Sequence, residues 1–412
     1  MIVQMKNRLK YMQIWERNLV ILWFGCFLAG IAFSLVMPFM SLYIETLGDF
    51  NQKDLSMLSG IAFSSTFIVT AFISPIWGRL ADRKGRKLML LRAALGMALV
   101  IGAMGLVQNV YQLIGLRLLQ GVFAGFISNA NALIATQVPR EKSGWALGTL
   151  TTGNVTGTLL GPLAGGLIAG AFGYRVTFFI TGFLLLSVFF LTLFFVKEHF
   201  EPVAKKDELS TKDVFKQIKQ PHIIIGMFIT TMMVQVAANS ISPILSLYVR
   251  QLSPHAQNIA FVSGIVASVP GIATLIAAPR FGLLGDKIGP QKILLTGLLG
   301  SIAVLIPMAF VTNAWQLGAL RFMLGISDAA LLPAIQSILT KYSPHNIAGR
   351  VFSYNQSFQA MGNVMGPLIG SSISAHFGYS AVFLVTPLFI LFNFILAKYN
   401  TKFIDEDHSS VA

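Results

Sequence analysis

The sequence predicts an all-α polytopic membrane protein with twelve transmembrane helices in two six-helix bundles. Three observations support this class: an apolar composition, twelve long apolar runs and an internal repeat. Of 412 residues, 55% are hydrophobic and only 11% are charged, and the mean hydropathy is +0.71. Soluble domains carry about 25% charged residues. The composition therefore excludes a soluble enzyme, and also a one-helix receptor with a large folded head.

The apolar runs are each long enough to cross a bilayer, which takes about 20 residues. Backbone amides in hydrocarbon must be satisfied within their own segment, so each run is predicted to be a helix. The first run is too long for a signal-peptide core and lacks a small-residue cleavage site, so we count it as a span. The runs are 19–43, 56–79, 88–107, 111–135, 144–170, 175–196, 222–249, 258–280, 291–311, 315–340, 349–374 and 379–397.

The distribution of Lys and Arg predicts the orientation of the chain. Of these 30 residues, 24 lie in the two tails and the alternate connections that share their side, including five in the 79–87 turn. The opposite connections hold only Lys53, Arg175 and Arg250. Because cytoplasmic loops are enriched in Lys and Arg, both termini are expected in the cytoplasm.

The net charge of +14 is therefore interpreted as a topology signal. A basic charge can indicate nucleic-acid binding, but here the charges lie in short turns between apolar runs, and no nucleic-acid partner is expected. The single cysteine, Cys26, cannot form an intrachain disulfide. The six histidines show no metal-ligand spacing, so no metal and no cofactor are expected.

One connection differs from the short loops elsewhere. The charged stretch 197–221 is predicted to be a cytoplasmic linker between two domains, 1–196 and 222–412.

The two halves repeat at an offset of 204 or 205 residues. The segment SGIAFS at Ser59–Ser64 recurs as SGIVAS at Ser263–Ser268, and FGY at Phe172–Tyr174 recurs at Phe377–Tyr379. Two similar halves with an even number of helices are typical of transporters, which bind substrate between the repeats near the bilayer midplane. The substrate site is expected there.

Three motifs resemble those of a known family. The turn GRLADRKGRK at Gly78–Lys87 and its repeat GLLGDKIGPQK at Gly282–Lys292 are similar to the signature loop of the major facilitator superfamily. LRLLQG at Leu116–Gly121 resembles its helix-4 arginine motif, and GTLLGPLAGG at Gly157–Gly166 resembles the antiporter motif of its drug/proton exchangers. The resemblance implies the major facilitator fold and proton-coupled export of drug-like molecules from a bacterial cell.

The signature loop is interpreted as a conformational latch. Positive-inside bias alone would explain its basic residues, but it does not explain Asp82 and its repeat Asp286. An acid there can meet helix N-termini and arginines and stabilise one closed state. Pro290 replaces the basic residue found at Arg86, so the second copy is expected to be weaker. The residues assigned to the latch are Gly78, Asp82, Arg83, Gly85, Arg86 and Asp286.

Glycines spaced by four place a smooth face on the fifth predicted helix, at Gly157, Gly161 and Gly165. A neighbouring helix can approach such a face closely, and Pro162 is expected to bend the helix. Tight packing alone would explain this pattern. The resemblance adds a second interpretation, in which the bend seals the pathway against ion leak. No nucleotide-binding lysine motif is present, so export is expected to use an ion gradient.

Ionisable side chains within the membrane are functional candidates by default. They are Arg117, its repeat partner Arg321, and Asp328, which shares a helix face with Arg321 and lies near mid-membrane. Burial favours a neutral carboxyl and a nearby arginine favours a charged one, so a conformational change could make Asp328 a proton carrier. A permanent structural pair of Arg321 with Asp328 is the alternative.

Several drug exporters of this superfamily carry an acid inside helix 1, whereas Leu19–Ile44 contains none. Glu45 stands at the outer end of that helix, where solvation at the surface explains it. The proton site is thus the part of the resemblance with least support from the residues.

The remaining polar candidates are neutral. They could line a mostly apolar cavity, or they could simply make hydrogen bonds between helices. A cavity with adaptable apolar walls suits varied amphipathic compounds better than a single sugar. The candidates are Asn131, Gln235, Asn239, Gln356, Gln359 and Asn363.

The sequence thus predicts a secondary transporter that exports drug-like compounds across the bacterial cytoplasmic membrane in exchange for protons. The expected partners are amphipathic small molecules, protons and lipid, with a monomer as the functional unit. The alternative is a proton-coupled symporter that imports a small nutrient, which requires a denser set of polar cavity groups. A polytopic membrane enzyme would require a clustered nucleophile, acid pair or metal site, and none is found in the sequence. No sensory or output domain indicates a receptor.

Overall fold

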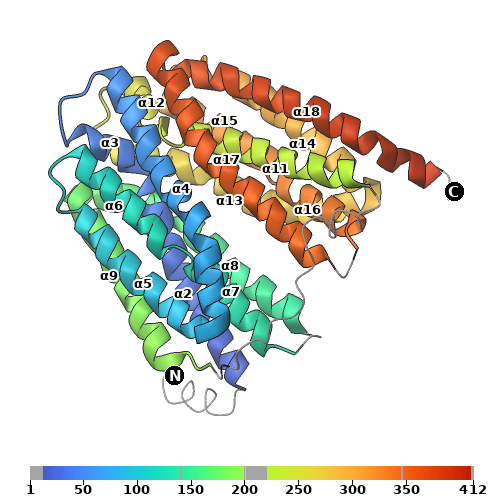
Figure 1. The fold of residues 1–412 in the computed structure, drawn as a ribbon. Helices are drawn as coiled ribbons and strands as arrows, with labels where there is room; N and C mark the ends of the chain where they lie inside the picture. Colours follow the sequence, from blue (N-terminus) through green and yellow to red (C-terminus); the bar gives the residue numbers. More distant parts are fainter. Residues whose placement is uncertain (1–12, 140–141, 199, 201–219, 345–346, 410–412) are drawn as a thin grey trace. The chain divides into compact units, whose positions relative to one another are not determined.

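The computed structural model describes residues 13–139, 142–198, 200, 220–344 and 347–409. Every regular element in these ranges is helical, and long helices follow one another through short turns (Figure 1). Eleven segments of this part of the chain are long and apolar enough to cross a membrane. The twelfth, α17 (Ala348–Phe377), is 30 residues long but carries more polar side chains. The prediction of twelve transmembrane helices is therefore confirmed.

The first six spans cover most of the chain before residue 196. Their elements are α2 (Ile14–Leu35) with η1 (Met37–Phe39) and α3 (Met40–Glu45), α4 (Gln52–Lys84), α5 (Arg86–Met104), α6 (Val110–Phe123) with α7 (Phe126–Gln137), α8 (Ser143–Phe172) and α9 (Tyr174–Phe195).

The second six spans repeat this order. Their elements are α11 (Pro221–Ile241) with α12 (Leu245–Leu252), α13 (Ile259–Ile288), α14 (Pro290–Met308), α15 (Ala314–Asp328) with α16 (Leu331–Tyr342), α17, and α18 (Tyr379–Ser409).

Contacts divide the chain into two compact units. The first unit comprises Met1–Phe39 and Ile68–Ala204, and the second comprises Met40–Phe67 and Lys205–Ala412. The second unit thus includes α3 and the N-terminal half of α4, where the Ser64 hydroxyl donates to the Val364 carbonyl at 2.9 Å. The boundaries predicted at 196 and 222 follow the sequence repeat instead. Most of the predicted linker, at 199 and 201–219, lies outside the described residues.

The glycine face of α8 packs directly on the backbone of α2. A Cβ atom added to Gly157, Gly161 or Gly165 would overlap a carbonyl oxygen or side chain of α2, so only glycine permits this approach. Pro162 lies inside the same helix. The arrangement recurs 205 residues later, where Gly362, Gly366 and Gly370 of α17 meet the carbonyl oxygens of Met232, Val236 and Ser240 on α11.

The fourth and tenth spans are each divided into two helices, although their sequences predict continuous ones. In the fourth span the break falls at Ala124 and at Gly125, whose φ of 111° favours glycine. In the tenth span it falls just after Asp328, the repeat equivalent of Ala124. Apolar periodicity did not reveal either break because both halves of each span remain apolar.

Candidate functional site

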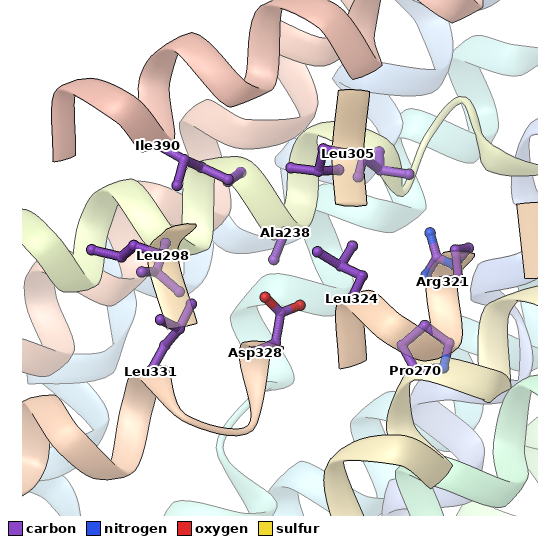
Figure 2. Close-up of a pocket in the computed structure, with 12 residues that line it drawn as sticks. Ala238, Pro270, Leu298, Leu305, Arg321, Leu324, Asp328, Leu331 and Ile390 are labelled. Atoms are coloured by element: carbon purple, nitrogen blue, oxygen red, sulfur yellow. The ribbon is translucent and has the colours of Figure 1, made fainter. Parts of the chain in front are cut away.

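Asp328 lies at the break of the tenth span, on the wall of an internal cavity of the second unit. The cavity has a volume of about 210 Å³. Figure 2 shows the Asp328 carboxylate among apolar side chains, with Leu324 between it and Arg321. The lining residues are Val234, Ala237, Ala238, Ile241, Pro270, Leu298, Leu305, Arg321, Leu324, Asp328, Leu331 and Ile390.

Two polar partners position the charged groups of this cavity. The Ser301 hydroxyl, on α14, lies 3.3 Å from Oδ1 of Asp328 and donates to it. The Nε of Arg321 donates to the Val266 carbonyl of α13 at 3.0 Å. Arg321 and Asp328, both in the described part of the chain, do not form a direct ion pair. The permanent pair considered from the sequence is therefore not formed in this conformation.

An arginine holds the corresponding break in the first unit. Arg92 of α5 donates to the carbonyls of Val122 and Ala124 at 3.1 and 2.8 Å, and its guanidinium lies 3.9 Å from the centre of the Trp77 ring. The Trp77 indole N–H also donates to Val122, at 2.8 Å. These side chains satisfy carbonyls that the break leaves without helical partners. Arg92 lies within the predicted span 88–107, but no role was predicted for it.

Threonines brace both breaks in the same way. The Thr70 hydroxyl donates to the Gly121 carbonyl at 3.3 Å, and the equivalent Thr274 donates to Gly325 at 2.9 Å. The two units therefore share this detail of their design. They differ where Ala124 in the first unit is replaced by the ionisable Asp328 in the second.

Arg117 is 2% exposed in α6, and its Nη1 donates to Oε1 of Gln120 at 2.8 Å. It belongs to the first unit, whereas Arg321 and Asp328 line one cavity of the second.

The predicted latch contains a helix cap that the sequence did not reveal. Gly85, with a φ of 93°, precedes α5, and the Glu198 carboxylate accepts from the backbone N–H groups of Arg86 and Lys87 at 2.8 and 2.7 Å. Gly78 has open space beside it and Arg83 is exposed. The side chains of Asp82 and Asp286 lie outside the described residues.

Three of the six neutral polar candidates come together. The Asn239 amide donates to Oδ1 of Asn363 at 3.1 Å and lies 3.5 Å from Oε1 of Gln235. Gln356 is exposed, and Gln359 and Asn131 are half-buried. None of the six lines the cavity that contains Asp328. The break at Ala124 and Gly125 also interrupts the helical register that related Asn131 to Arg117.

One further hydrogen bond between helices was not predicted. The Thr231 hydroxyl of α11 donates to Oδ1 of Asn355 on α17 at 2.8 Å, within a buried environment. Neither residue stands out in the sequence, because threonine and asparagine occur on many faces of these helices.

Two repeated units of broken and closely packed membrane helices, with an embedded acid at one break, define a polytopic transporter rather than an enzyme. The profile of the Major Facilitator Superfamily matches residues 22–267 and 227–403. The chain belongs to the major facilitator superfamily.

Several bacterial relatives match nearly the whole chain. The chain is 58% identical over 379 residues to the multidrug resistance protein MdtG of Enterobacter lignolyticus, covering 92% of this chain and 91% of the relative. It is 59% identical over 381 residues to MdtG of Citrobacter koseri, covering 92% and 94%. It is 58% identical to MdtG of an Escherichia coli strain, covering 92% and 93%.

Solved structures share the fold at low sequence identity. A bacterial homologue of the human lysosomal transporter Spinster, in an inward-facing and unoccupied conformation, has a TM-score of 0.78 at 14% identity and covers 95% of this chain and 98% of that chain. A nucleoside transporter has a TM-score of 0.75 at 14% identity, covering 93% and 99%.

Proposed function

We propose that this chain exports amphipathic drug-like compounds across the bacterial cytoplasmic membrane in exchange for protons. The relatives named multidrug resistance protein support the direction and the substrate class, since their alignments cover more than nine tenths of each chain. Both termini lie in the cytoplasm in this proposal, and the monomer is the transporting unit. The fold alone does not select the substrate, because the same fold serves a nucleoside transporter.

The observation that carries proton coupling is the position of Asp328. Its carboxylate meets an apolar cavity, has one hydroxyl donor in Ser301, and is not ion-paired with Arg321. Burial disfavours a charged carboxylate, and a small change in its distance from Arg321 or Ser301 alters that balance. A conformational change that moves α14 or α15 can therefore bind and release a proton at Asp328.

The cavity around Asp328 is small for a drug. Sites for drug-sized ligands usually measure about 300–1,000 Å³, against about 210 Å³ here. The proposal accordingly assigns this cavity to the proton and places the drug elsewhere.

The test is substrate-driven proton movement in inside-out membrane vesicles. A dye that reports the pH gradient is followed while cationic, neutral and anionic amphiphiles are added. We expect gradient loss with the wild type, none with Asp328→Asn, and a normal response with Asp49→Asn, a control at an exposed loop position.

Equal responses from wild type and Asp328→Asn would remove Asp328 from the proton pathway. No response of the wild type to any compound would contradict drug export and favour the alternative, a nutrient symporter, which uptake assays in whole cells would then test.

A further inference from the structure

The first unit contains a groove between the N-terminal ends of α2 and α8. Its hollow has a volume of about 500 Å³ and is lined by Trp15, Glu16, Leu19, Val20, Lys142 and Trp145. A smaller adjoining hollow extends it along Leu19 and Val20 to Trp23 and Thr149. Three of the five tryptophans of the chain thus lie along one groove.

The sequence repeat explains why the groove exists in the first unit. Thr149 and Gly153 of α8 correspond to Tyr354 and Phe358 of α17 at the offset of 205. In the second unit these large rings pack on Phe228, with ring centres 6.5 and 5.4 Å away. Phe228 is itself the equivalent of Trp23 and is 1% exposed. At Gly153 the Trp23 indole already occupies this space, since an added Cβ atom would lie 3.1 Å from its Cδ1 atom. At Thr149 the small side chain lines a hollow where the second unit has the Tyr354 ring.

The walls of the groove favour a flat aromatic ligand. Trp145 is 64% exposed, and the Trp23 indole is fixed by a 3.0 Å hydrogen bond to the Thr152 hydroxyl and by stacking on Phe27 at 5.7 Å. Rigid indoles give a large contact area at low entropic cost, and aromatic rings stack on them in offset or edge-on geometry. The Tyr354 ring, which the second unit has at the position of Thr149, is itself a template for such a ligand.

The charged side chains of the groove, Glu16 and Lys142, lie at the end that Trp15 forms. Glu16 accepts from the Gln13 backbone N–H at 3.1 Å, and the Lys142 ammonium lies 5.5 Å from the centre of the Trp15 ring. One acid and one base give this end no net charge, while the deeper end at Leu19, Val20 and Trp23 is apolar. The groove is thus suited to an amphipathic molecule with an aromatic body and a polar end.

The geometry points to this groove as a binding site for planar aromatic amphiphiles on the export pathway, with Thr149 in its wall where the second repeat has a tyrosine ring. The inference rests on the proposed function and names the substrate class that it would take. The volume of the groove falls within the range of ligand pockets, about 300–1,000 Å³. The cavity at Asp328 is smaller than this range.

A neutral naphthalene that carries an aryl azide tests the inference. The purified full-length protein in lipid nanodiscs is illuminated with this probe, and labelled peptides are mapped by mass spectrometry. We expect labels on the groove walls in α2 and α8. Thr149→Tyr, which restores the ring of the second repeat, is expected to reduce this labelling at least severalfold. Thr151→Tyr is the matched control, because Thr151 is exposed two residues away and does not line the groove.

Three outcomes would overturn the inference: labels only outside these walls, undiminished labelling of Thr149→Tyr, or labelling of the walls only by a phospholipid with a photoreactive acyl chain. Labelling needs no ion gradient, so it reports binding separately from transport. A wild type that exports the same naphthalene without its azide, but is not labelled in the groove, contradicts only this inference. A wild type that is labelled but exports nothing contradicts only the proposed function.

Discussion

Glu45, the last residue of α3, forms an ion pair with Arg250 of α12 across 205 residues of sequence. Both belong to the second unit, and each side chain is a little over one third exposed, at 39% and 38%. The two residues are also repeat equivalents at the offset of 205, so duplicated positions have acquired opposite charges. The pair ties the C-terminal end of the first span to the C-terminal end of the seventh. The sequence had assigned Glu45 only to surface solvation.

Reversal of one charge in this pair should destabilise the conformation described here. Exposed ion pairs contribute about 0.2–1 kcal/mol, so Glu45→Arg should lower the thermal midpoint of the detergent-solubilised protein modestly, and less at high salt. The double variant Glu45→Arg with Arg250→Glu should recover the loss. Asp49→Arg, a reversal at an exposed neighbouring position, controls for net charge. A double variant no more stable than the single one would show that the pair does not contribute.

Alanine at Gly157 or Gly362 should destabilise the protein strongly. In each case the added Cβ atom would overlap a carbonyl oxygen of the partner helix, and overpacking costs about 1–3 kcal/mol. The control is Gly148→Ala on the same α8, where the space is open and alanine should be neutral or stabilising by up to about 1 kcal/mol. Thermal unfolding followed by tryptophan fluorescence measures all three. Equal behaviour of Gly157→Ala and Gly148→Ala would contradict the close packing.

Replacement of Arg92 should loosen the break in the fourth span. Arg92→Ala leaves the Ala124 carbonyl without its 2.8 Å donor and removes the contact with Trp77. A buried polar group without a partner costs about 1–3 kcal/mol. Hydrogen exchange of the backbone amides around 122–129, followed by mass spectrometry, should be faster in Arg92→Ala and unchanged in the exposed control Arg83→Ala. Unchanged exchange in Arg92→Ala would show that Trp77 and Thr70 hold the break without Arg92.

Neutralisation of Glu198 should weaken the start of α5. Its carboxylate accepts from two backbone N–H groups at a helix N-terminus, where a negative charge contributes about 0.3–1 kcal/mol at the surface. Glu198→Gln keeps an acceptor and loses the charge, so a thermal midpoint should fall slightly in low salt. High salt should narrow the difference from wild type. A loss that does not change with salt would indicate lost hydrogen-bond geometry instead of a charge–dipole effect.

The sequence predicted the helices well because long apolar runs in hydrocarbon have only one backbone solution. It also predicted a smooth face at Gly157, Gly161 and Gly165, but not its partner, since a spacing of four defines a face and not what packs on it. The same spacing recurs at Gly362, Gly366 and Gly370, so comparison of the two repeats could have indicated a second glycine face.

The details of the site were less predictable because they depend on contacts between distant segments. Glu198 caps a helix more than 100 residues earlier, and Arg92 serves carbonyls 30 and 32 residues later. Asp328 was found because an acid within a span is costly and rare. The six neutral candidates were less reliable, since amides between helices hydrogen-bond to one another as readily as they line a cavity.

The duplicated glycine contacts also fix the distance between the two helices of each pair. Helices whose backbones touch over more than two turns cannot slide without separating carbonyl oxygens from glycines. We therefore expect α2 with α8, and α11 with α17, each to behave as a single rigid body. Spin labels on both helices of one such pair should report a constant separation through every stage of transport. The constant distance within such a pair would serve as an internal reference for label-to-label distances that change during transport.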